Sequence, residues 1–105
     1  MQSAEVEIGE LLNLHNLKLS VAESCSAGGI SFRICSISGS SNYFLGGIVS
    51  YSNQSKIRDV GVSENSIKNF TEVSKEVALQ MSEGIAKKFN SDFSISTTGY
   101  AGFTG

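Results

Sequence analysis

The architecture of this chain can be read from one segment, Leu19-Ser20-Val21-Ala22-Glu23-Ser24-Cys25-Ser26-Ala27-Gly28-Gly29. Its apolar first half predicts a short buried strand, and its serines and glycines predict a sharp turn into a helix. Serine often caps a helix because its side-chain oxygen accepts hydrogen bonds from free backbone N–H groups. Those N–H groups lie at the positive end of the helix dipole and favour an anion or an oxyanion. Ser24 is therefore the best candidate for a reacting group, unless Ser24 and Ser26 only cap the helix.

The composition is that of an ordinary globular protein. The chain has 105 residues, of which 40% are hydrophobic and 17% are charged, so we expect a single domain over residues 1–105. A formal net charge of −2 gives no general electrostatic basis for binding nucleic acid or an anionic membrane. No apolar run approaches the roughly 20 residues of a membrane span, and the N-terminus does not resemble a signal peptide. We therefore expect a cytoplasmic protein.

Hydrophobic periodicity predicts that helices and strands alternate along the chain. Helices are predicted at residues 4–16, 26–36, 54–59, 63–69 and 74–90, and strands at residues 18–22, 43–52 and 93–97. Gly46 and Gly47 within the second strand indicate a bulge or a close backbone contact. Residues 77, 81, 85 and 89 are apolar and repeat at a helical spacing, so we expect them to face the sheet. This order predicts an α/β fold, in which helices pack on a small, mostly parallel or mixed sheet in a three-layer-like single domain.

The predicted strands end in small polar residues. These ends carry Glu23-Ser24-Cys25, Tyr51-Ser52-Asn53 and Thr98-Gly99. In open α/β sheets, ligands bind beyond the carboxyl ends of the strands. We therefore expect the three ends to form one site.

Lys56 is the best-placed base for a serine nucleophile, because it follows the second strand by a few residues. A lysine acts as a base where burial or a neighbouring cation lowers its pKa toward neutrality. Thr98 and Gly99 could supply a hydroxyl and a backbone N–H to an oxyanion. Plainer interpretations remain open: Lys56 as a solvated surface lysine, and Thr98-Gly99 as an ordinary turn.

Other residues give less specific patterns. Cys25 could be a thiolate nucleophile at a helix N-terminus, although we prefer to interpret it as a small packed side chain. Cys35 lies in an apolar helical pattern that predicts a buried thiol. His15 is expected at the end of the first helix, and a single histidine leaves too few soft ligands for a zinc site. Ser40 and Ser41, beside glycines, could hold a phosphate.

Several short motifs, taken in order, resemble one protein family. They are Ala22-Glu23-Ser24-Cys25-Ser26, Gly39-Ser40-Ser41-Asn42-Tyr43-Phe44-Leu45-Gly46-Gly47, Tyr51-Ser52-Asn53-Gln54-Ser55-Lys56, Val73-Ser74-Lys75-Glu76-Val77-Ala78 and Thr98-Gly99-Tyr100-Ala101-Gly102. From Leu17 to Gly102 the chain resembles the C-terminal domain of the competence/damage-inducible protein CinA, a family that includes the bacterial nicotinamide-nucleotide amidases. The family usually has glycine where this chain has Ala27, so we expect crowding in that loop.

The resemblance implies hydrolysis of nicotinamide mononucleotide to nicotinate mononucleotide and ammonia, with no metal and no cofactor. It implies Ser24 as the nucleophile, Lys56 as the base and Thr98 near the reacting carbonyl. With the strand-end argument, it leads us to expect a larger set of substrate-binding residues: Ser26, Gly28, Ser40, Ser41, Tyr51, Asn53 and Gly99. The expected partners are this small-molecule substrate and further copies of the chain in a homo-oligomer.

Domains of this family continue with further strands, a helix and a basic residue of the site, which the present sequence does not include. A sheet without those strands exposes an edge, which invites pairing with another chain. Two hypotheses therefore stand beside each other. The first is an amidohydrolase with a Ser-Lys dyad, which would be contradicted by Ser24 and Lys56 side chains that lie far apart or by a fully solvated Lys56. The second is a catalytically inactive, truncated CinA-like protein that binds a nucleotide or a protein partner.

Overall fold

A three-stranded parallel sheet forms the centre of the computed structural model, which describes residues 2–100. The strand order is β2-β1-β3. The strands are β1 (Leu19–Glu23), β2 (Phe44–Val49) and β3 (Phe93–Ser96). The expected α/β fold is confirmed, and the sheet is wholly parallel rather than mixed. Ala101 and Gly102, which belong to the last motif, lie outside the described residues.

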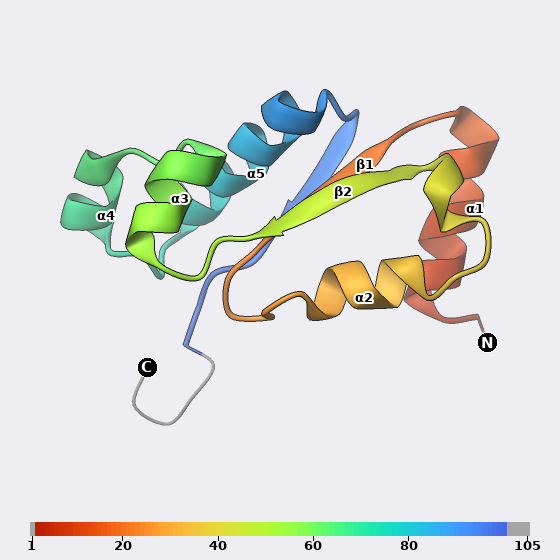
Figure 1. Cartoon of the computed structure of the whole chain (residues 1–105), viewed down its shortest axis with the longest axis horizontal. Helices are drawn as coiled ribbons and strands as arrows, with labels where there is room; N and C mark the ends of the chain where they lie inside the picture. The colour runs from red at the N-terminus through yellow and green to blue at the C-terminus, as the bar shows by residue number, and fades with distance from the viewer. Residues whose placement is uncertain (1, 101–105) are drawn as a thin grey trace.

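Helices cover both faces of this sheet (Figure 1). On one face are α1 (Ala4–His15) and α2 (Gly29–Cys35), and on the other are α3 (Asn53–Val60), α4 (Glu64–Phe70) and α5 (Lys75–Phe89). A short 3-10 helix, η1 (Ser40–Asn42), precedes β2. Within residues 2–100, no helix combines the length and the apolar content needed to cross a membrane.

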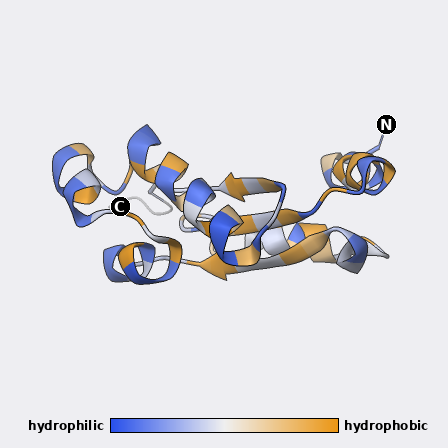
Figure 2. Cartoon of the chain, turned by 90° about the horizontal axis from the view of Figure 1, so that it is seen from above, coloured by the Kyte–Doolittle hydropathy of each residue, from blue (hydrophilic) through white to orange (hydrophobic). Residues whose placement is uncertain are grey.

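Each face of the sheet has its own apolar core, because successive side chains of a strand point to opposite faces. On one face, Ala22 packs with side chains of α3, of the α3–α4 loop and of α5, namely Val60, Val62, Val77, Met81 and Ile85. On the other face, Leu19 and Val21 pack with Leu12, Ile34 and Tyr43. Figure 2 shows the hydrophobic colour concentrated on the strands, with hydrophilic residues on the outer helices. The helical spacing expected for residues 77, 81 and 85 is confirmed, since all three are fully buried.

Capping residues account for most of the helix ends. α1 and α5 end at Asn16 and Asn90, which both adopt the left-handed conformation with φ 54°. α3 begins one residue before the predicted range of 54–59, because Ser52 caps this helix, accepting from the Ser55 backbone N–H at 3.0 Å, so that Asn53 is its first residue. The predicted burial of Cys35 was wrong, because this thiol is exposed at the end of α2.

Gly46 and Gly47 lie at a bulge with close neighbours, as their pairing in the sequence predicted. The register against β1 shifts from Leu19↔Phe44 to Ser20↔Gly46, so one residue of β2 is left over. A Cβ atom on Gly46 would lie 2.8 Å from the ring of Phe89, and one on Gly47 would lie 2.6 Å from Ser31 Oγ. Only glycine therefore lets α5 and α2 approach the two faces of β2 this closely.

Candidate active site

The carboxyl ends of the strands meet at one cavity of about 340 Å³. It is lined by seven of the residues that the sequence singled out: Ser24, Tyr51, Ser52, Asn53, Lys56, Thr98 and Gly99. They come from the segments after β1, β2 and β3, which run parallel and end on the same side of the sheet. The expectation that the three strand ends form one site therefore agrees with the geometry.

Ser24 follows β1 directly and is 4% exposed. Its backbone N–H donates to Thr97, with 3.1 Å to the carbonyl oxygen and 3.2 Å to Oγ1. This anchors the Ser24 main chain to the end of β3. In the described part of the chain, the Ser24 hydroxyl makes no hydrogen bond, so its oxygen is free to face a ligand in the cavity.

Lys56 lies in the first half of α3 and is 2% exposed. Its Nζ donates to the Tyr51 carbonyl oxygen at 2.9 Å. Burial has the largest influence on the pKa of Lys56 and lowers it, while the nearby Glu72 and Cys25 act in the opposite direction and leave it below the ordinary lysine value. Of the two interpretations that the sequence left open, the solvated surface lysine does not fit this burial, and a buried lysine of this kind can lose its proton to act as a base.

Thr98 holds the loop before α5 against the end of β3. Its Oγ1 donates to the backbone carbonyl of Glu72 at 2.6 Å. The hydroxyl proton is therefore directed at this loop rather than into the cavity. Thr98 nonetheless lines the cavity with Gly99, and its oxygen retains lone pairs that can accept a hydrogen bond.

Glu23 caps α2, a role that the sequence pattern had suggested for Ser24 or Ser26. Its buried carboxylate accepts four hydrogen bonds, from the backbone N–H groups of Ile30 and Ser31 and from the hydroxyls of Ser26 and Ser31. Burial alone would raise the pKa of Glu23, but these hydrogen bonds together lower it. The helix predicted from residue 26 therefore begins only at Gly29, and its first amides are occupied by Glu23 rather than open to an oxyanion.

Two of the expected substrate-binding residues support the turn instead of lining the cavity. Ser26 Oγ lies 2.7 Å from the Glu23 carboxylate and 2.7 Å from Thr97 Oγ1. Gly28 has φ 94°, a conformation suited to glycine, and precedes α2. The neighbouring Ala27 is also left-handed, with φ 51°, which is unfavourable for an alanine. The crowding expected at Ala27 therefore takes the form of backbone strain.

Ser40 and Ser41 lie away from the cavity. Both are in η1, before the first residue of β2, whereas Ser24 follows the last residue of β1. Because the two strands are parallel, these positions are at opposite ends of the sheet. The structure does not bring these two serines to the residues around Lys56.

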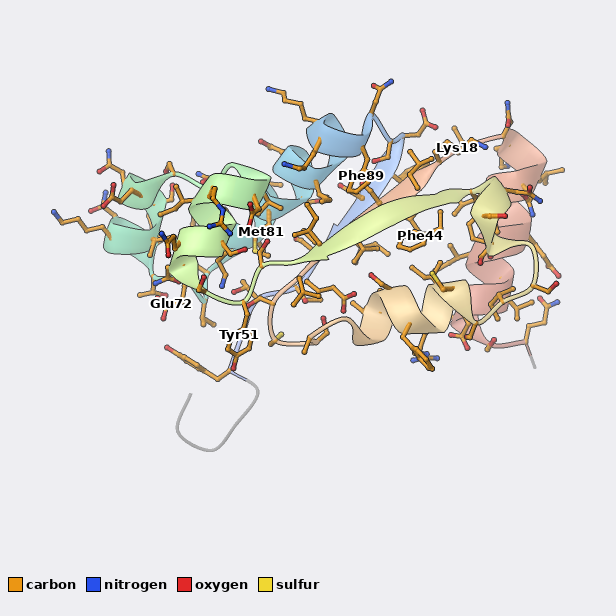
Figure 3. All side chains as sticks on the ribbon, viewed as in Figure 1. Lys18, Phe44, Tyr51, Glu72, Met81 and Phe89 are labelled. Atoms are coloured by element: carbon orange, nitrogen blue, oxygen red, sulfur yellow. The ribbon has the colours of Figure 1, made fainter. Side chains whose placement is uncertain are left out.

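The sequence pattern assigned no role in the site to three residues that line the cavity, Glu72, Val73 and Tyr100. A topological signal could have found Glu72 and Val73. The helix that joins two parallel strands runs back across the sheet, so it starts where the strands end. Residues just before the Ser74 cap of α5 must then lie beside Ser24 and Lys56. Figure 3 shows Glu72 and Tyr51 at this end of the molecule and Lys18 at the other.

The cavity therefore combines a free serine hydroxyl, a buried lysine and a carboxylate. This set is suited to nucleophilic attack on a carbonyl group, with proton transfer through the lysine. Across residues 2–100, no group of three or more His, Cys, Asp or Glu side chains is arranged to hold a metal ion.

Comparisons with known sequences agree with these features. The family model of the CinA C-terminal domain matches residues 1–105. The chain is 48% identical over 104 residues to a competence-damage inducible protein of Caldicellulosiruptor saccharolyticus and 46% identical over 101 residues to a CinA-like protein of Flavobacterium psychrophilum. These alignments cover 99% and 96% of this chain but 25% and 24% of the relatives. The chain thus spans about a quarter of the length of these relatives.

Solved structures share the fold. A competence-damaged protein (CinA) superfamily protein from Escherichia coli superposes with a TM-score of 0.94 at 28% identity, covering 100% of this chain and 66% of that one. A competence/damage inducible protein from Agrobacterium tumefaciens gives a TM-score of 0.93 at 34% identity, covering 96% and 61%. The full-length family match and the shared fold show that this chain belongs to the CinA C-terminal domain family.

Proposed function

We propose that this chain is an amidohydrolase that converts nicotinamide mononucleotide to nicotinate mononucleotide and ammonia through Ser24 and Lys56. The observation that carries the proposal is the burial of Lys56 at the cavity that Ser24 lines. A surface lysine would remain protonated at neutral pH, whereas burial lowers the pKa of Lys56 and makes a neutral amine accessible.

The proposed reaction begins when Lys56 Nζ takes the proton of the Ser24 hydroxyl as Ser24 Oγ attacks the carboxamide carbon. The tetrahedral intermediate collapses by breaking the C–N bond, and the Lys56 ammonium returns a proton to the leaving nitrogen, which departs as ammonia. Water then attacks the acyl-serine ester with Lys56 again as the base. The ester bond breaks, nicotinate mononucleotide is released and Ser24 regains its proton.

The surroundings of the two residues suit this chemistry. α3 begins at Asn53, which lines the cavity, so the positive end of this helix dipole is close to the reacting group and favours developing negative charge. The backbone bond between Ser24 and Thr97 keeps the nucleophile in place. The bond from Thr98 to the Glu72 carbonyl keeps the far wall of the cavity in place.

Ammonia release from nicotinamide mononucleotide tests the proposal. The wild-type chain would be compared with Ser24→Ala and Lys56→Ala, and with the controls Ser38→Ala and Lys68→Ala, which alter exposed residues outside the cavity. We expect turnover in the wild type and in both controls. The two active-site variants should lose activity by about 10³-fold or more, which is the scale on which base and nucleophile variants act.

A folded wild-type sample that releases no ammonia would contradict the amidase and favour the second hypothesis, a protein that binds without catalysis. Full activity in Ser24→Ala would contradict the nucleophile. In that case, a Cys25→Ala variant would ask whether the adjacent thiol takes over its role.

A further inference from the structure

The carboxylate of Glu72 has no assigned task in the reaction above. Glu72 lines the cavity with Ser24, Lys56 and Thr98, and it is half-buried. Its backbone carbonyl is held by the Thr98 hydroxyl at 2.6 Å. Within residues 2–100 its side chain forms no ion pair and no hydrogen bond. A negative charge is therefore held at the cavity wall, close enough to Lys56 to raise the pKa of this lysine but without an ion pair to it.

The backbone before Glu72 is constrained toward this position. Thr71 has φ 72° and ψ 160°, a region that a β-branched residue rarely adopts. The conformation is held by hydrogen bonds from the Thr71 N–H to the Ile67 carbonyl at 2.9 Å and from Ser74 Oγ to the Thr71 carbonyl at 2.8 Å. Together with the Thr98 bond, these contacts direct residue 72 to the cavity rather than to open solvent.

Two tyrosines share the cavity with this carboxylate. Tyr51 and Tyr100 both line it, and each is 66% exposed although it carries a large aromatic ring. Aromatic faces attract cations and stack with flat rings. A cavity lined by a carboxylate and by two exposed aromatic rings is therefore suited to a planar cation, and less suited to a neutral or an anionic ring.

We propose that Glu72 makes this cavity selective for a carboxamide carried on a planar cationic ring. The inference rests on the proposed function and names the feature of the substrate that the pocket recognises. In a pyridinium carboxamide, the charge and the amide are on the same small ring. An amide at Ser24 therefore keeps the charge inside the cavity that Glu72 lines.

Ligand binding tests this selectivity separately from turnover. The probes are nicotinamide mononucleotide and its neutral benzamide isostere, in which a ring carbon replaces the charged nitrogen. Calorimetric titration would use Ser24→Ala as the parent, so that nothing is hydrolysed. The same parent with Glu72→Gln removes the charge at constant shape, and the parent with Glu64→Gln removes a charge from an exposed site on α4.

We expect Glu72→Gln to weaken binding of the cationic ligand about fivefold at low salt and to change binding of the neutral isostere less than about twofold. The effect on the cationic ligand should shrink as salt is added. The Glu64→Gln variant should match the parent with both ligands. Thermal unfolding would confirm that all variants remain folded.

Equal weakening of both ligands by Glu72→Gln would overturn the inference, because it would mean a structural role. Unchanged binding of the cationic ligand, or a parent that binds neither ligand, would overturn it as well. A charge-selective cavity in a wild-type chain that releases no ammonia would support the inference while contradicting the proposed amidase. Ammonia release by the wild type without any charge selectivity due to Glu72 would support the proposed amidase and overturn this inference.

Discussion

The two ends of the sheet carry cavities of similar size and opposite character. At the carboxyl ends, a cavity of about 340 Å³ is lined by hydroxyls, a carboxylate and a buried lysine. Toward the amino ends, a cavity of about 360 Å³ lies between α1 and β3. It is lined mainly by Ile8, Leu11, Leu12, Leu17, Leu19, Phe93 and Ile95. His15 and Ser94 complete this lining, but only the first cavity combines a serine hydroxyl with a buried lysine and a carboxylate.

Loop composition does not explain this difference, because serines and glycines occur at both ends. The segment around Ser24 and the segment around Ser40 look alike as sequences. What separates them is position on a parallel sheet, since the loop after a strand meets the start of the following helix and the loop before a strand does not. Topology rather than residue type therefore locates the reactive end.

Among substitutions that test the difference between the two cavities, Lys56→Met is expected to have the largest effect. Methionine fills a similar volume without a charge, so the variant should lose about 10³-fold in kcat/KM. Its unfolding free energy should stay constant or rise, because a buried ammonium with one protein acceptor is costly. Ammonia release and urea unfolding would measure the two quantities.

Lys68→Met serves as the matched control for Lys56→Met. It changes an exposed lysine of α4 and should alter neither activity nor stability. A Lys56→Met protein that remains active would remove the main chemical distinction between the two cavities.

The next largest effect is expected from Gly84→Ala, which acts on the packing that supports the reactive end. A Cβ atom at Gly84 would lie 1.6 Å from the Val60 backbone oxygen, so α5 and the end of α3 must separate. We expect a loss of about 3 kcal/mol in unfolding free energy, at the upper end for overpacking. Since α3 carries Lys56, activity should fall as well.

Gly29→Ala is the control for Gly84→Ala, because a Cβ atom there meets nothing within 4 Å. Chemical denaturation of both variants would measure the difference. Equal stability of the two proteins would show that the contact between α3 and α5 does not hold the reactive end together.

A smaller effect is expected from Glu23→Gln. An amide cannot accept at both of its terminal atoms, so the hydrogen bonds from Ser31 or those from Ser26 and Ile30 would be lost. We expect a loss of about 2 kcal/mol near pH 7. The folded-state pKa of Glu23 is lowered from 4.5, so its stabilisation is complete above pH 4.5 and is lost as pH falls through the folded-state value.

Denaturation of the wild type and of Glu23→Gln at several pH values tests whether the stabilisation by Glu23 decreases as pH falls. The difference in unfolding free energy should shrink in acid. A difference that grows as pH falls would mean that the Glu23 carboxylate is not the group that stabilises the turn before α2.

Patterns along the chain predicted the parts of this molecule that depend on local chemistry. The spacing of Val77, Met81 and Ile85 predicted the buried face of α5, and Gly46-Gly47 predicted the bulge in β2. The same patterns failed where the partner is distant in sequence. Glu72 reaches the cavity only through the return path of α5, and Thr97 meets Ser24 and Ser26 only after β3 pairs with β1.

The start of α2 shows a further limit of sequence patterns. Serines around residue 24 predicted a helix cap, but a carboxylate has more acceptor sites than a hydroxyl and can accept from two successive amides and two side chains. Glu23 therefore outcompetes its serine neighbours and shifts the helix start to Gly29. A glutamate at the end of an apolar strand, followed by small polar residues, is the signal that could have indicated this.

The smallest effect is expected from Ser40→Ala and Ser41→Ala, which test whether serines at the other end of the sheet contribute to the reaction. Both serines precede β2, so neither variant should change kcat/KM for nicotinamide mononucleotide by more than about twofold, the noise expected of surface changes. Steady-state ammonia release measures this, with Asn53→Ala as the paired variant that lines the reactive cavity. A large loss in Ser40→Ala or Ser41→Ala would mean that the serine-rich loop of one copy reaches the cavity of another, because within one chain the parallel strands keep the two ends apart.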